Sequence, residues 1–470
     1  MRRLLHFWSL AAALAVAGLP SVSQAQIAIS EDAHQVFTLA PQLYPELFSG
    51  GGELGTFQGY VYRHYSASGV YIGLQNERLH LLGGPFGETL SSPGTVAEVR
   101  QVLETQKVEK DAAERAVIRT ELMRSWNAHG ATSSGSPRLT HLPMRMQDVE
   151  SIIPLGLMAG GHVTPIDHIY FGPINRDSPL GAYEVYVVGN GVISEISTRP
   201  NHTSTGVEYR VVLQHTANFY SYYDLIDVLD PAIASQIPAG ALDNGKIHRG
   251  PISVSGGQVL GRIGGKTLDF ANVDTNTFLP GFIRPASYAR EPWKIFTVDT
   301  FAAYDEPLRS QLLAKTNRVA LPRIGKIDFD VSGALRGNWF LQNTNGYAGA
   351  AEVANTSQYH VGHLAIVPYV MDPSYYVVSL GEFKGQATQL GVRSMPQDPA
   401  TITPATGLVK LELVQPPNGG PPALSNAQSP GLGTILLQVL PGEQLKVQVF
   451  PDVAPDAVSG FTEAARLYVR

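Results

Sequence analysis

The chain has 470 residues, a formal net charge of −6 and no cysteine. The lack of cysteine excludes disulfides and thiolate-bound metals, and the mildly acidic balance argues against nucleic acid as a partner, because binding to phosphates needs a basic surface. Hydrophobic residues make up 44% of the chain, enough for the cores of several domains, and its 47 glycines and 33 prolines predict many turns between strands.

Residues 1–25 have the pattern of a secretory signal peptide. Arg2 and Arg3 precede an apolar run from Leu4 to Leu19, and the small residues of a cleavage site end at Ala25. No later stretch is apolar over the roughly 18 residues that a membrane-spanning helix needs. We therefore expect a secreted or periplasmic protein without a membrane span.

Residues 30–92 predict a small α+β module. Asp32 is placed to cap a short amphipathic helix from Ala33 to Leu39, and short alternating strands follow a run of three glycines. The tyrosines of these strands are best explained by packing. Residues 93–137 then predict a helical connector and linker: acidic and basic residues interleave to about residue 128, and a segment rich in glycine and serine follows.

Strand patterns dominate residues 139–288, where three stretches stand out. The first, GGHVTPIDHIYF from Gly160 to Phe171, brings His162, Asp167 and His168 together on a loop that enters a strand. The others are VEYRVVLQHTANFYSYYDL and GGQVLGRIGGKTLDFANVD, which begin at residues 207 and 256. Their order and content resemble the lysostaphin-like (LytM-type) zinc peptidases that cleave peptidoglycan. That resemblance implies a β-sandwich of the duplicated-hybrid-motif fold over about residues 155–285.

The resemblance also implies a metal site. The family's H-x-x-x-D motif supplies two zinc ligands, and His162 and Asp167 match them, although four residues separate the pair here instead of three. The family's H-x-H-F-E segment supplies the third ligand, and Asp269 stands there in place of a histidine. The implied cofactor is one divalent metal ion, most simply zinc, although a His/Asp/Asp set favours harder metals than zinc.

The family's two catalytic histidines are both replaced. Asp224 stands where the Y-x-H-L motif has its histidine, and Thr267 stands at the first histidine of H-x-H-F. His215 matches the histidine of the I-x-H-G segment, which is not a ligand. Asp224 and His215 are therefore the candidate proton carriers, because a threonine hydroxyl donates a hydrogen bond but does not shuttle protons at neutral pH.

Two functions stay open at this point. One is a metal-dependent peptidoglycan endopeptidase that uses these residues; the other is a catalytically inactive homologue that binds a cell-wall polymer or glycan, or has a structural role there. Simpler interpretations also exist: His162 can cap a turn, and His215 can be a packed core histidine. The partner under either function is peptidoglycan or another envelope polymer, and the oligomeric state is left open.

Residues 291–470 again favour strands. Within them, Tyr359 to His363 places His360 and His363 three residues apart before an apolar strand, which we interpret as a polar loop. The expected fold class is therefore a mainly β multidomain protein, with a small N-terminal α+β module, a helical connector, a lysostaphin-like β-sandwich and a C-terminal β domain.

Overall fold

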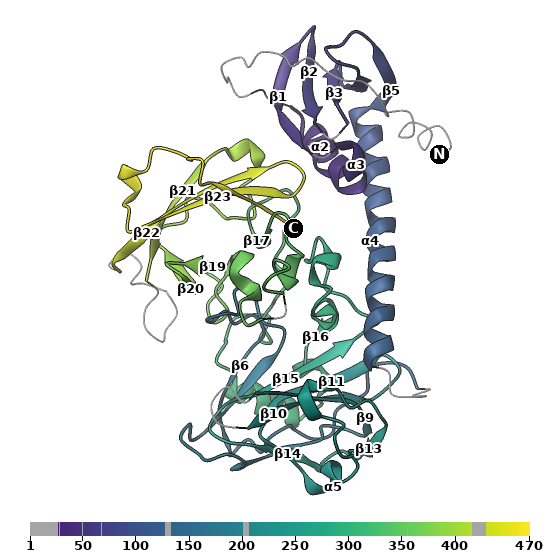
Figure 1. Cartoon of the computed structure of the whole chain (residues 1–470), viewed down its shortest axis with the longest axis vertical. Coiled ribbons are helices and arrows are strands. Elements are labelled where there is room, and N and C mark those ends of the chain that lie inside the picture. The colour runs from purple at the N-terminus through teal and green to yellow at the C-terminus, as the bar shows by residue number, and fades with distance from the viewer. Residues whose placement is uncertain are drawn as a thin grey trace.

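The computed structural model describes residues 27, 29–48, 50–66, 68–126, 133–200, 206–354, 356–415 and 429–470. The predicted signal peptide and the start of the predicted linker lie outside the described residues. Figure 1 shows a small N-terminal module at one end of a long helix, a large β domain at the other end, and a C-terminal barrel above the large domain.

The N-terminal module is a helix packed on an antiparallel sheet whose strands follow chain order. Helix α2 is capped by Ser30, whose hydroxyl accepts from the amide of Ala33, so the cap predicted at Asp32 is wrong by two residues. Asp32 instead pairs with Arg100 at 3.3 Å. The elements are α2 (Glu31–Leu43), α3 (Pro45–Phe48), β1 (Gly51–Phe57), β2 (Tyr60–Tyr65), β3 (Val70–Gln75), β4 (Arg78–Leu82) and β5 (Thr89–Thr95).

Helix α4 (Val96–Trp126) is one uninterrupted helix of 31 residues, which makes it about 46 Å long. Its buried residues lie towards its two ends. Val96, Val99 and Leu103 complete the core of the N-terminal module, whereas Ile118, Leu122 and Trp126 join the core of the central domain. The helix thus connects the two domains and is packed into the core of each at its ends, as Figure 1 shows.

The central domain is built on two antiparallel sheets. The larger one has the strand order β13-β9-β10-β11-β15-β7-β6, with β16 paired to β15, and the smaller one has the order β12-β14-β8. The strands are β6 (Val149–Ile153), β7 (Ile169–Pro173), β8 (Tyr183–Tyr186), β9 (Gly191–Pro200), β10 (Val207–Gln214), β11 (Phe219–Ile226), β12 (Val228–Leu229), β13 (Ile252–Val254), β14 (Val259–Ile263), β15 (Leu268–Asp274) and β16 (Thr297–Val298).

Short helices follow β15 and pack on this domain. Ile295, Phe296 and Phe301 are buried in the same core as the strands. The short helices of the chain are α5 (Pro231–Ala234), η2 (Asp243–Gly245), η3 (Pro285–Tyr288), η4 (Pro292–Phe296), η5 (Phe301–Ala303), α6 (Leu308–Lys315), η6 (Gly346–Ala348), η7 (Tyr359–Gly362), η8 (Pro404–Thr406) and η9 (Pro455–Ala457).

The C-terminal strands form a closed barrel, each strand pairing with the next and β24 returning to β17. They are β17 (Gly337–Leu341), β18 (His363–Pro368), β19 (Tyr376–Phe383), β20 (Gln386–Val392), β21 (Val409–Val414), β22 (Gly431–Leu440), β23 (Gln444–Pro451) and β24 (Arg466–Val469). The prediction of a mainly β multidomain protein is confirmed. No described helix combines the length and the apolar character needed to cross a membrane.

Candidate functional site

Three neighbouring strands of the large sheet place polar side chains in one row. Asp224 on β11 lies opposite Asp269 on β15, and Asp269 lies opposite Tyr170 on β7. Residues paired across antiparallel strands face the same side of the sheet, and Tyr222, two residues before Asp224, shares that side. The loop before β7 brings His162, Asp167 and His168 to the same face.

Asp167 is almost fully enclosed, with 2% of its surface exposed. The ammonium of Lys294 lies 2.6 Å from its Oδ1, and the hydroxyl of Tyr222 donates to its Oδ2 at 3.0 Å. Burial opposes the charged carboxylate, but Lys294 and then His168 outweigh it and hold the pKa of Asp167 well below its usual value. Lys294 is buried as well, contacts Glu291 at 3.1 Å, and has a raised pKa because these carboxylates outweigh its desolvation.

His168 lies between the two aspartates. Its Nε2 is 3.2 Å from Oδ2 of Asp269, a contact that falls short of hydrogen-bond geometry, and its Nδ1 is 3.7 Å from Oδ1 of Asp167. The remaining oxygen of Asp269 accepts from the Thr267 hydroxyl at 3.1 Å. Desolvation lowers the pKa of His168, but Asp269 and Asp167 together raise it to about 9. His168 is therefore an imidazolium at neutral pH.

His162 lies at the exposed rim, its ring 6.3 Å from that of His168. Desolvation, and then the charges of His168 and Lys294, lower its pKa to about 4, although the residue itself is open to solvent. The barrel holds this rim: the side chain of Gln389 accepts from the amide of Gly160 at 3.0 Å and donates to its carbonyl at 3.1 Å.

The second histidine segment of the sequence also reaches the site. The ring of His360 lies so close to Gly161 that a Cβ there would come within 2.8 Å of it. His363 is 2% exposed and packs against Phe340 and Tyr347. The interpretation of this segment as a polar loop is wrong for His363, because the barrel buries that residue among aromatic rings.

The two predicted proton carriers are placed differently. Asp224 is on the site face but pairs with Arg199 at 3.0 Å; its pKa is raised because desolvation outweighs Arg199 and Arg210. His215 lies on the opposite face, where its Nε2 contacts the hydroxyl of Ser221 at 2.8 Å and its Nδ1 donates to the carbonyl of Asn190 at 3.0 Å. The fold thus gathers His162, Asp167, Asp269 and Asp224 on one face and leaves His215 on the other.

The gathered residues do not fit a resident metal ion. Both oxygens of Asp167 and both oxygens of Asp269 already contact donors of the protein, and a metal at Asp167 would face the buried ammonium of Lys294. Among the described residues, no group of three or more histidine or acidic side chains is arranged to hold a metal. The expectation of zinc is therefore not supported by this donor set.

Lys294 is the residue that sequence reasoning missed. It lies 127 positions after Asp167, outside the segment that resembles the peptidase family. The one local signal is its place within Pro292-Trp293-Lys294-Ile295-Phe296, where a charged residue interrupts an apolar run. A buried lysine in such a run requires a buried anion nearby.

Comparisons with known proteins add little. No family model and no curated protein matches the chain. A zinc-containing peptidase from Vibrio cholerae is similar at 14% identity and a TM-score of 0.14, over 46% of this chain and 47% of that one. The solution structure of lysostaphin is similar at 12% identity and a TM-score of 0.22, over 57% of this chain and 96% of that one. The chain thus spans about half the length of the first of these structures, and both TM-scores are too low to support an argument about fold or activity.

Proposed function

We propose that this protein is a non-catalytic relative of the lysostaphin-like peptidases that acts outside the cytoplasm as a binding or structural protein of the cell envelope. The observation that carries the proposal is the buried ion pair between Lys294 and Asp167, with 2.6 Å between Nζ and Oδ1. In this proposal the positive charge that a metal would bring is supplied by Lys294 and the protonated His168.

Electrostatics explains why these cations and a metal exclude each other. A carboxylate as buried as Asp167 is stable only when a cation or several donors compensate its charge. Lys294 and Tyr222 already do so, and a divalent ion would bring two further positive charges beside an ammonium that cannot reach solvent. Metal binding would therefore require Lys294 to leave its buried position.

The proton-transfer groups of a hydrolase are also unsuited to their role. Asp224 pairs with Arg199, and His215 lies on the far face of the sheet. Thr267 uses its hydroxyl to bind Asp269. The residues on the site face hold protons in fixed ion pairs and hydrogen bonds, which favours a scaffold over a hydrolytic centre.

The alternative function is a metal-dependent endopeptidase, and one observation favours it. His162, the residue that matches the family's first ligand, has an exposed position within 6.3 Å, ring to ring, of the His168 that bridges Asp167 and Asp269. If Lys294 withdrew, His162, Asp167 and Asp269 would be left to bind a cation.

Metal content separates the two functions. We expect purified protein, loaded with zinc or manganese and then desalted, to retain far less than a stoichiometric amount of metal by mass spectrometry, with no difference between wild type and His162→Ala. Stoichiometric metal in the wild type that is lost in His162→Ala would refute the proposal.

The predicted partner is tested by incubating the protein with purified peptidoglycan and sedimenting the polymer. We expect protein in the pellet and no released fragments, and absence of binding would refute an envelope-polymer role.

A further inference from the structure

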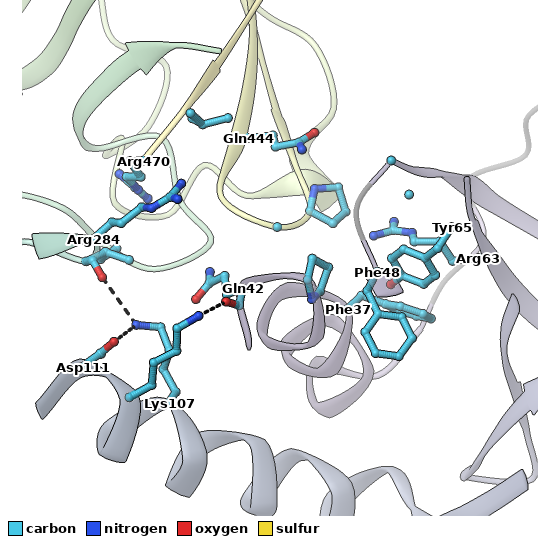
Figure 2. Close-up of a pocket in the computed structure, with 18 of the residues that line it drawn as sticks. Phe37, Gln42, Phe48, Arg63, Tyr65, Lys107, Asp111, Arg284, Gln444 and Arg470 are labelled. Carbon is cyan, nitrogen blue, oxygen red and sulfur yellow. Dashed lines mark hydrogen bonds and ion pairs between the residues drawn. The ribbon is translucent and has the colours of Figure 1, made fainter. Parts of the chain in front are cut away.

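A second site lies where the domains meet, far from the row of aspartates. A pocket of about 220 Å³ is enclosed by helix α2 and strand β2 of the N-terminal module, by helix α4, by Ile283 and Arg284, and by the end of the barrel. Figure 2 shows the barrel on one side and the helices of the N-terminal part on the other. The volume lies below the roughly 300–1,000 Å³ of pockets for drug-sized ligands, so an occupant is small.

One end of the pocket is aromatic and contains a buried charge. Arg63 is 6% exposed and stacks its guanidinium over Phe37 at 4.8 Å, and Figure 2 places both beside Phe48 and Tyr65. Among the residues whose side chains the structure describes, no carboxylate pairs with Arg63. A buried charge without a counter-ion is costly, so this guanidinium calls for an anion.

Three side chains that line the pocket carry buried polar atoms; Arg63 and Tyr65 lie at the aromatic end, and Gln42 lies further along, towards Lys107. Arg63 Nε and both side-chain amide atoms of Gln42 are buried without a hydrogen-bond partner in the described part of the chain. The buried hydroxyl of Tyr65 has the guanidinium of Arg63 as its polar neighbour. Tyr65 is 1% exposed. Buried donors and acceptors are nearly always satisfied in folded proteins, and these atoms come from three side chains that line one pocket. Together they offer donors to an anion and an amide for pairing.

The other cations around the pocket are paired with carboxylates or are more exposed than Arg63. Lys107 pairs with Asp111, Arg470 pairs with Glu443 at 2.7 Å, and Lys110 donates to the backbone carbonyl of Gln42 at 2.7 Å. Glu114 also lines the pocket. Arg284 is exposed at the opposite end, with Lys107 and Asp111, as Figure 2 shows. The guanidinium of Arg63 is therefore the buried charge at which we expect a ligand to bind.

We infer that this pocket binds a small organic carboxylate that also carries an amide. The carboxylate pairs with Arg63 and accepts from the Tyr65 hydroxyl, because a guanidinium fork matches the two oxygens of a carboxylate. The amide of the ligand pairs with Gln42, and its apolar part packs on Phe37 and Phe48. Because residues from all three domains line the pocket, an occupant also fixes how the N-terminal module sits on the barrel.

The test is calorimetric titration of the full chain with N-acetylalanine, with its neutral amide N-acetylalaninamide and with inorganic phosphate. We expect saturable binding of the acid only. Arg63→Met should weaken it tenfold or more and Gln42→Leu should weaken it less, whereas Arg78→Met, which removes an exposed arginine of the same module, should leave it unchanged.

Several outcomes would overturn the inference: no saturable binding of the acid, equal binding of acid and amide, binding of phosphate alone, or equal weakening by Arg63→Met and Arg78→Met. Circular dichroism and the unfolding temperature show whether Arg63→Met folds. If it does not fold, the weaker binding expected of Gln42→Leu still tests the inference. The inference does not depend on the proposed function, because the pocket shares no residue with the site around Asp167.

Discussion

Replacing Lys294 with methionine tests the internal charge balance of the candidate site directly. Methionine keeps the length of the apolar stem and removes only the ammonium, so the change leaves Asp167 buried without its closest cation. Removing one partner of a buried ion pair typically costs about 3–5 kcal/mol. We expect the lower end of that range, about 3 kcal/mol, because Tyr222 still donates to Asp167 and His168 remains 3.7 Å away.

The assay is urea unfolding followed by tryptophan fluorescence. Trp293 precedes Lys294 and stacks on Trp126 with 5.4 Å between the ring centroids, so the signal reports unfolding at the site. Lys384→Met is the matched control, because Lys384 pairs with Asp452 on the exposed surface, where such pairs contribute below about 1 kcal/mol.

A double variant separates charge from packing. Lys294→Met combined with Asp167→Asn removes both charges, and we expect it to be more stable than Lys294→Met alone, because no unpaired charge is then buried. Equal destabilisation by Lys294→Met and Lys384→Met would refute the argument that Lys294 compensates the buried charge of Asp167.

Two further predictions concern the same region. The pKa of His168 is raised from an unfolded value of about 6.5 to about 9, so its contribution of up to about 3 kcal/mol is fully present below pH 6.5 and is lost as the pH rises through 9. Urea midpoints between pH 6 and pH 10 should therefore fall more steeply for the wild type than for His168→Gln, and parallel curves would contradict the raised pKa. Gln389→Ala removes both hydrogen bonds to Gly160, worth about 1 kcal/mol each, and should speed hydrogen exchange in residues 157–168, measured by mass spectrometry. Unchanged exchange there would show that the barrel does not hold this loop.

Local patterns in the sequence were sufficient to predict much of the secondary structure. The stretch predicted to be helical from residue 93 is one helix that begins at Val96, because residues 93–95 still belong to strand β5. The alternating segments at 207–214 and 219–226 are neighbouring strands β10 and β11. The cap at Ser30 was missed because Ser30 and Asp32 are both good capping residues, and the choice between them depends on where the first turn begins.

The candidate site was predictable only in part. The sequence placed Asp167 on a loop and Asp224 and Asp269 on strands, but it contained no information on register, which sets Asp224 opposite Asp269. Strand alternation also decides that His215 contacts Ser221 on the far face, away from Tyr222.

By itself, the sequence determined that this is a β-rich, cysteine-free, multidomain chain with ligand-type residues on a loop and strands, because composition and short-range periodicity are local properties. Only the tertiary structure decided what those residues do. Lys294 reaches Asp167 across 127 positions, and residues of the N-terminal module line one pocket together with residues of the barrel. The compensation of a buried charge depends on which side chains lie within a few ångströms, and spacing along the chain does not specify that distance.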